Sequence, residues 1–248
     1  MRKSDFHIFV VSLLVAGFIM TSLTRPGAQN NNQKLPGQTQ AAQPAASASY
    51  QTALQLFQRG RQLQLANKDA DAEKVFASSL SQTEKLLLAE PSNVDYLALK
   101  AANLFRLKRY QEVVSLVQKN QDTKQDYRIL ETLAEALYFL GQNEEALKVF
   151  AHYIEMAPPN EERMSSAYYY IGECYIRLKK YEHADIAFTT ATTMEKQMYY
   201  WWYRLGYVKE MLGRYMKAYE AYGSSLKLNP SFAPARDGQA RVKAKTGL

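Results

Sequence analysis

The sequence predicts an all-α protein, and three observations support this class. Glycine and proline are sparse, at 11 and 8 of 248 residues, and most lie outside the periodic segments. Apolar residues recur at helical spacing through most of the chain. A two-helix pattern also recurs at a fixed offset of 34 residues near the C-terminus. Together these features favour stacked helical hairpins over a turn-rich β fold.

The composition bounds the function. Hydrophobic residues make up 47% of the chain, which is enough to bury a sizeable core. The formal net charge is +7, but basic residues mostly alternate with acidic ones along the expected helices, as on a solvated face. We therefore expect no nucleic-acid partner. Cys174 is the single cysteine, so neither a disulfide within the chain nor a cysteine metal site is expected, and a core position is expected for it.

Residues 1–24 predict a signal anchor, which is a transmembrane helix that is not cleaved. An apolar run of 18 residues, from Phe6 to Leu23, follows Arg2 and Lys3. As a helix it would be about 27 Å long, close to the thickness of the hydrocarbon core. The positive residues would stay in the cytoplasm, which places the rest of the chain on the extracytoplasmic, periplasmic side of the cell membrane. The alternative is a cleaved signal peptide and export, although the sequence after the run offers only a poor cleavage site.

A linker is expected at residues 25–49, directly after the anchor. This segment is rich in Gln, Asn, Ala, Pro and Ser and holds almost no large apolar residue. Such a composition cannot bury enough surface to offset the entropy lost on ordering. We therefore expect a disordered linker that keeps the following domain near the membrane.

Two helices recur together in two closely matched copies near the C-terminus. The first helix carries Gly172 in one copy and Gly206 in the other. The second helix carries a small alanine followed four residues later by Phe188 or Tyr222. The small residues let the two helices approach closely, and the aromatic ring packs one turn further along. The pattern resembles the tetratricopeptide repeat, whose period is 34 residues.

The resemblance implies a right-handed α-solenoid of about five helical hairpins. The hydrophobic helix expected from the apolar run precedes this array. The array is expected over residues 50–230 and a capping helix over 231–248. Seven extra residues in the first unit predict an elongated second helix, and four extra residues near 158–164 predict a longer loop. The units are expected at residues 53–91, 94–124, 127–158, 165–198 and 199–230.

In this fold the first helices line a concave groove, so the resemblance also implies which residues meet a partner. Tyrosines offer a large contact area at low entropy cost, and glutamates would favour a partner segment carrying Lys or Arg. Alternatively, individual tyrosines pack against the neighbouring unit. The residues expected to bind the partner are Glu135, Tyr138, Tyr169, Glu173, Tyr200, Tyr203, Tyr207 and Glu210.

The sequence favours a binding protein over an enzyme. We find no phosphate-binding loop, metal-spaced cluster or nucleophile motif, and so expect no catalysis, cofactor, metal or small-molecule substrate. The expected function is a protein–protein interaction scaffold in a cell-envelope complex. The alternatives are a structural building block that packs through its edges or convex face, and a periplasmic holdase-type assembly chaperone. The basic C-terminus, with Arg236, Arg241, Lys243 and Lys245, is expected to be a solvated cap, or else to touch anionic lipid.

Overall fold

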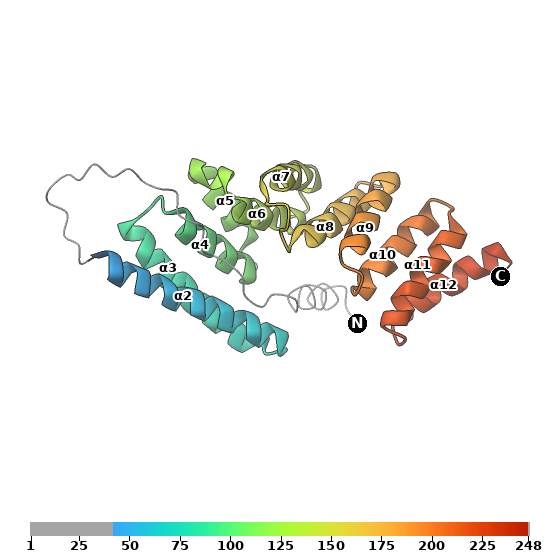
Figure 1. The fold of residues 1–248 in the computed structure, drawn as a ribbon, viewed down its shortest axis with the longest axis horizontal. Helices are drawn as coiled ribbons and strands as arrows, with labels where there is room; N and C mark the ends of the chain where they lie inside the picture. Colours follow the sequence, from blue (N-terminus) through green and yellow to red (C-terminus); the bar gives the residue numbers. More distant parts are fainter. Residues whose placement is uncertain (1–41, 248) are drawn as a thin grey trace. The chain divides into compact units, whose positions relative to one another are not determined.

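The computed structural model describes residues 42–247 of the chain. Within this range there are eleven α-helices, one short 3-10 helix and no strand, which confirms the all-α prediction. Successive helices form the hairpins of a tetratricopeptide-like solenoid. The chain divides after Leu107 into two compact parts, and each is described by itself (Figure 1).

The first part consists of three helices. Its central helix packs against both of the others. It has 21 residues, which confirms the elongated second helix expected in the first unit. The first helix starts within the predicted linker, so residues 42–49 are helical; the alanines there are the strongest helix formers. The helices are α2 (Ala42–Leu65), α3 (Asp69–Ala89) and α4 (Val94–Arg106).

The second part holds the remaining helices, each packed against the next along the chain (Figure 1). The loop after α7 is the longer connection expected near residues 158–164. The elements are α5 (Tyr110–Lys119), η1 (Gln121–Gln125), α6 (Tyr127–Phe139), α7 (Asn143–Met156), α8 (Met164–Arg177), α9 (Tyr181–Met194), α10 (Tyr199–Met211), α11 (Tyr215–Leu228) and α12 (Ala233–Thr246).

The turns inside the helical hairpins share a left-handed residue. Gly141, between α6 and α7, and Gly213, between α10 and α11, have φ angles of 80° and 71°. Glycine takes this conformation without steric cost because it has no Cβ. Lys179, between α8 and α9, occupies the equivalent turn with a φ angle of 58°, and Lys108 at the start of the second part has a φ angle of 60°. A lysine in this region carries strain of about 1–2 kcal/mol.

The small and aromatic positions of the repeat meet in the core, as the sequence pattern predicts. A Cβ atom added at Gly206 on α10 would lie 2.6 Å from the Tyr222 ring on α11. The equivalent distances are 2.7 Å from Gly172 to Phe188 and, in the first part, 2.6 Å from Gly60 to Phe76. All three rings are fully buried, so these glycines permit a close approach of the two helices in each hairpin.

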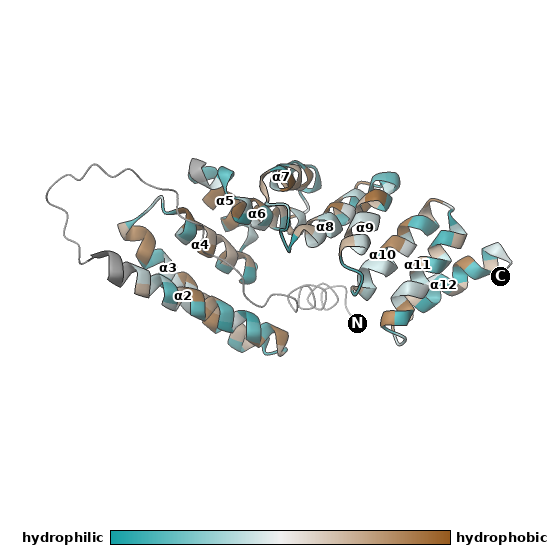
Figure 2. Ribbon diagram, in the orientation of Figure 1, coloured by the Kyte–Doolittle hydropathy of each residue, from teal (hydrophilic) through white to brown (hydrophobic). Residues whose placement is uncertain are grey.

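The predicted anchor at residues 1–24 lies outside the described residues, as does most of the predicted linker at 25–49. Among the helices of residues 42–247, none is both long and apolar enough to cross a membrane. Figure 2 shows instead that polar and apolar residues alternate along these helices, as expected where one face is buried.

Candidate functional site

The eight residues expected to bind a partner all lie on the first helices of the last three repeats, in the second part of the chain. Whether they bind a partner stays a prediction, but the structure shows the surroundings of each. Glu135 and Tyr138 are on α6, Tyr169 and Glu173 are on α8, and Tyr200, Tyr203, Tyr207 and Glu210 are on α10.

Three of the tyrosines lie in the interior and not on an open surface. Tyr138, Tyr169 and Tyr200 are only 3%, 4% and 8% exposed. The Tyr169 ring stacks on Trp201 at 5.4 Å, and the Arg177 guanidinium lies 3.7 Å from the centre of the Tyr138 ring. Burial raises the pKa of each of these three phenols above its ordinary value. The alternative considered for individual tyrosines, packing against the neighbouring unit, therefore describes these three.

Glu135 takes part in an ion-pair cluster with a loop residue. Arg163, in the loop between α7 and α8, donates from a terminal guanidinium nitrogen to Glu135 at 2.7 Å, and its Nε donates to Glu131. Both carboxylates are buried, on one face of α6. These carboxylates raise the pKa of Arg163, although desolvation acts in the opposite direction. The guanidinium thus stays charged and joins two successive repeats.

Glu173 on α8 is held in the same way by the next repeat. Arg204 on α10 donates from Nε to one carboxylate oxygen at 2.5 Å and from a terminal nitrogen to the other at 2.9 Å. The side chains of Arg204 and Glu173 are 15% and 7% exposed. A two-point contact of this kind fixes the relative orientation of the two side chains in addition to pairing their charges.

Glu210 on α10 completes the series. Its carboxylate accepts a hydrogen bond of 2.7 Å from the Tyr222 hydroxyl and bonds of 3.1 and 3.0 Å from Arg241 on α12. Desolvation would raise the pKa of Glu210, but the bonds from Arg241 and Tyr222 outweigh it and lower the pKa. All three glutamates expected in the groove thus bind an arginine that comes later in the chain.

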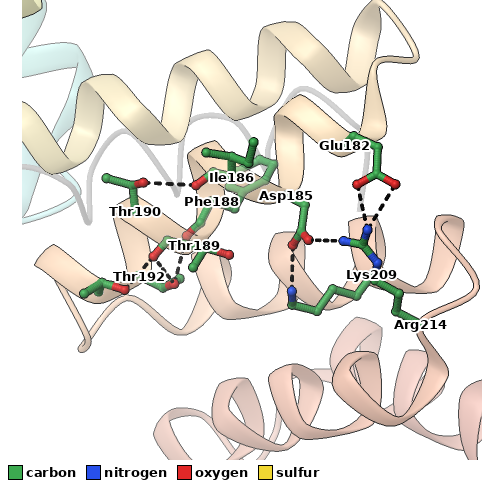
Figure 3. A network of polar contacts seen from close by, with 10 residues as sticks. Glu182, Asp185, Ile186, Phe188, Thr189, Thr190, Thr192, Lys209 and Arg214 are labelled. Carbon is green, nitrogen blue, oxygen red and sulfur yellow. Dashed lines mark hydrogen bonds and ion pairs between the residues drawn. The ribbon is translucent and has the colours of Figure 1, made fainter.

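A second carboxylate–cation network links α9 to the following repeat. Asp185 is buried, and it accepts bonds of 2.7 Å from Lys209 and 2.5 Å from Arg214 (Figure 3). Arg214 also reaches Glu182, at 2.8 Å. In Figure 3 both cations point at the Asp185 carboxylate from the next hairpin. Charge pairing therefore fixes how these repeats stack.

Sequence reasoning missed the arginines that neutralise the glutamates. Arg163 lies in the four-residue insertion near residues 158–164, which is the one signal that could have singled it out. Arg204 and Arg241 each lie 31 residues after the glutamate that they bind, and this shared offset could have singled them out. Because the glutamates are already paired, they offer little to a partner's Lys or Arg.

Tyr203 and Tyr207 on α10 are the expected tyrosines that remain partly exposed. Tyr203 is backed by aromatic rings, with Phe232 at 5.3 Å and Tyr222 at 6.0 Å between ring centres. The Arg204 guanidinium lies 5.3 Å from the centre of the Tyr207 ring. Both rings are held in place from behind, so each presents an edge that needs little further ordering to make a contact.

Other reactive groups are placed as structural residues. Cys174 is buried, and burial raises the pKa of its thiol to about 12, which confirms the expected core position. His152 lies on α7 and His183 on α9, where the His183 ring contacts Tyr175 at 5.0 Å. Among the described residues no group of three potential metal ligands comes together.

Comparison with known proteins supports the repeat assignment. The family model described as "Psidin, N-terminal TPR repeats region" matches residues 69–211, and a tetratricopeptide-repeat model matches residues 201–232. The phagocyte signaling-impaired protein of Drosophila pseudoobscura pseudoobscura is 29% identical over 126 residues. That match covers 50% of this chain but only 13% of the fly protein's length.

Solved structures with a similar fold include two structures of MamA. One MamA crystal structure has a TM-score of 0.57 at 15% identity and covers 82% of this chain and 97% of its own. MamA of Desulfovibrio magneticus RS-1, from residue 41 to its end, has a TM-score of 0.57 at 18% identity. That second match covers 74% of this chain and 97% of the other. At these identities the likeness concerns the fold alone.

Proposed function

The chain belongs to the family defined by the Psidin N-terminal tetratricopeptide-repeat region, and from this we infer that it is a protein-interaction scaffold without catalytic activity. The tetratricopeptide fold is typically a non-catalytic fold for binding other proteins, because its stacked hairpins expose long continuous surfaces. We place the binding surface on the first helices of the second part.

The partly exposed pair Tyr203 and Tyr207 is the observation that carries this proposal. Both project from α10, which is anchored by the fully buried contact between Gly206 and Tyr222. A tyrosine ring held on a rigid helix buries a large area and adds a hydroxyl group, with little entropy to lose. A partner segment lying along α10 would meet these two rings first.

The paired glutamates change the kind of partner that we expect. Glu135, Glu173 and Glu210 each bind an arginine of this chain, so a basic segment would have to compete with an internal ion pair. Breaking a buried pair such as Glu173–Arg204 leaves an uncompensated charge, which costs about 3–5 kcal/mol. We therefore propose aromatic contact at α10, and not charge attraction to the glutamates, as the basis of binding there.

We further propose that residues 6–23 anchor the protein in the cell membrane, with the repeats on the extracytoplasmic side as part of a cell-envelope complex. The sequence supports this through the apolar run, the preceding Arg2 and Lys3, and the poor cleavage site. Export after cleavage is the alternative. Fractionation separates the alternatives: a tethered chain stays with the membrane and keeps its full mass, whereas a cleaved chain is soluble and shorter.

A structural building block is the second candidate function, and exposed apolar residues on the second helices favour it. Ile186 on α9 is 70% exposed, and Met194 and Met216 are about half exposed. A holdase is less well supported, because the α10 surface combines tyrosines with ion pairs and is not broadly apolar. Self-association would require those apolar residues, whereas partner capture would require the tyrosines.

Photo-crosslinking tests the proposal. The photoreactive residue benzoylphenylalanine replaces Tyr203 or Tyr207 in the full-length chain, which keeps an aromatic ring at each position and so preserves the packing. The matched control carries the same residue at Ile186. Protein partners crosslinked from α10 and not from Ile186 support the scaffold. Crosslinks to copies of this chain from Ile186, with none from α10, favour the building block and contradict partner capture on α10.

A further inference from the structure

Positive charge is concentrated at the C-terminal end of the chain. Residues 211–248 hold seven lysines and arginines and two acidic residues, a net +5 out of +7 for the whole chain. Residues 108–210 hold thirteen basic and fifteen acidic residues, a net −2. The second part therefore ends in a cationic segment, and Figure 2 shows mostly hydrophilic colour along α12.

Most of these cations have no carboxylate of their own. Arg214 is bound by Asp185 and Glu182, and Arg241 is bound by Glu210. Lys245 lies 4.8 Å from the centre of the Tyr215 ring. The others are exposed and form no ion pair with any described residue: Lys217, Lys227, Arg236 and Lys243.

The packing of α11 on α12 sets the positions of these four cations along the two helices. Gln239 donates to the Tyr219 carbonyl at 3.3 Å, and a Cβ at Gly238 would lie 2.5 Å from the Tyr222 ring. Together with the Lys245–Tyr215 contact, these pairings show that the two helices run antiparallel. In this register Lys217 lies at the level of Lys243, and Lys227 lies near the level of Arg236.

The same contacts show which faces the cations occupy. Arg236 is three residues before Gln239, and Lys243 is four residues after it. Both therefore lie on the same side of α12 as Gln239, which contacts α11. Lys227 is four residues after Gly223, whose added Cβ would lie 3.1 Å from the Gln239 amide nitrogen. Lys217 is two residues from both Tyr215 and Tyr219, which face α12, so it projects from the opposite side of α11 and lies outside this row. We call Lys227, Arg236 and Lys243 the cationic seam.

The seam has charge at its two ends. Along α12, Arg236 and Lys243 are about 10 Å apart, at 1.5 Å per residue. One end therefore carries Lys227 and Arg236, and the other end carries Lys243. Glu220 lies two turns before Lys227 on the same side of α11, at a level between Arg236 and Lys243, so the middle of the seam is not positive.

We propose that the cationic seam binds an acidic segment of the partner protein, with carboxylates at both ends of the contact. This inference rests on the proposed scaffold function and adds the chemistry of the partner. A spacing of about 10 Å corresponds to carboxylates about three residues apart in an extended segment. In a helix it corresponds to about seven residues, or two turns.

The charge pattern favours a protein segment over a membrane or a nucleic acid. A uniformly negative surface would be repelled by Glu220 and Asp237, which are both exposed among the cations. A peptide can place its carboxylates only where the cations are. The outer face of α12 also carries alanines and no aromatic side chain that would insert into a bilayer.

The test measures binding of a fluorescein-labelled peptide, Glu-Glu-Gly-Ser-Glu-Glu, to the full-length protein by anisotropy. A peptide of the same composition with its four glutamates contiguous is the spacing control. The seam variant combines Lys227→Glu with Lys243→Glu, one substitution at each end. Its matched control combines Lys148→Glu with Lys196→Glu, which are exposed lysines elsewhere in the second part and give the same change in net charge.

We expect the seam variant to bind the spaced peptide at least about tenfold more weakly than the control variant, with tighter binding at low salt. Equal loss in both variants would show a net-charge effect and overturn the proposal, as would absence of peptide binding. Seam-dependent binding to vesicles of about one part phosphatidylserine in four, without peptide binding, would assign the seam to lipid. Crosslinking from Tyr207 that persists in the seam variant would keep the scaffold function and reject the seam.

Discussion

Substituting Gly206 by alanine tests the central packing contact of the last repeat. The added Cβ would lie 2.6 Å from the Tyr222 ring, closer than such atoms normally approach. The ring has little room to move, because a Cβ built on Gly238 would lie only 2.5 Å from its hydroxyl end. Its hydroxyl is also fixed by a 2.7 Å bond to Glu210. One methyl group must therefore displace a helix.

Two opposing effects set the expected size of the change. Replacing glycine by alanine inside a helix normally stabilises by about 0.5–1 kcal/mol. Overpacking a well-filled core costs about 1–3 kcal/mol. We expect Gly206→Ala to lower the free energy of unfolding by about 1–2 kcal/mol, which in a domain of this size lowers Tm by about 2–8 °C.

The assay is thermal unfolding of the full-length chain followed by circular dichroism, with hydrogen exchange to locate the loss in α10–α12. Gly223→Ala is the matched control, because its added Cβ would meet only the movable end of Gln239, at 3.1 Å. We expect that variant to be neutral or slightly stabilised. If Gly206→Ala is as stable as Gly223→Ala, the close contact does not limit the packing and the reasoning is refuted.

Four further predictions concern charge and strain. Arg204→Met leaves its buried carboxylate partner unpaired and should lower the free energy of unfolding, measured in urea, by about 3–5 kcal/mol. Arg241→Met removes a side chain that is 54% exposed and should lower it by under about 1 kcal/mol. Similar losses in the two variants would contradict the argument from burial. Burial raises the pKa of Glu161 above its usual 4.5, so ionisation of this side chain opposes folding once the pH exceeds 4.5. Glu161→Gln should therefore raise Tm at pH 7 but not near pH 4. A difference in Tm between variant and parent that does not change with pH would refute this. The Cys174 thiol, with its pKa raised to about 12, should react with a thiol reagent at neutral pH only after unfolding; rapid labelling of the native protein would show the site to be open. Lys179→Gly should stabilise by up to about 1 kcal/mol, because its φ of 58° suits glycine, and destabilisation would mean that the lysine makes a compensating contact.

The helical hairpins could be predicted because their signals are local. A small residue and an aromatic ring at fixed spacing, as in Gly172 with Phe188, specify one hairpin without reference to the rest of the chain. The length of α3 followed in the same way from a count of extra residues. The start of α2 was harder to predict from the sequence, because a polar, alanine-rich segment is compatible with both a helix and a linker.

The candidate site was only partly predictable, because it depends on which repeats meet. Glu173 stood at a slot that faces a groove in this fold, yet Arg204, 31 residues later, covers it. Tyr169 stood at a similar slot and stacks on Trp201 of the next repeat. Which side chains are covered depends on how far each repeat rotates against its neighbour, and no single repeat encodes that angle.

By itself, the sequence determined the class of fold, the order of the hairpins and the concentration of charge at the C-terminus. These properties depend on neighbours within one or two helices or on composition alone. Only the tertiary structure decided that the groove glutamates are neutralised, that three of the five tyrosines are buried, and that three cations line one seam. Ion pairs and ring contacts between repeats act over a few ångströms, so they form only when stacking brings residues from different repeats together.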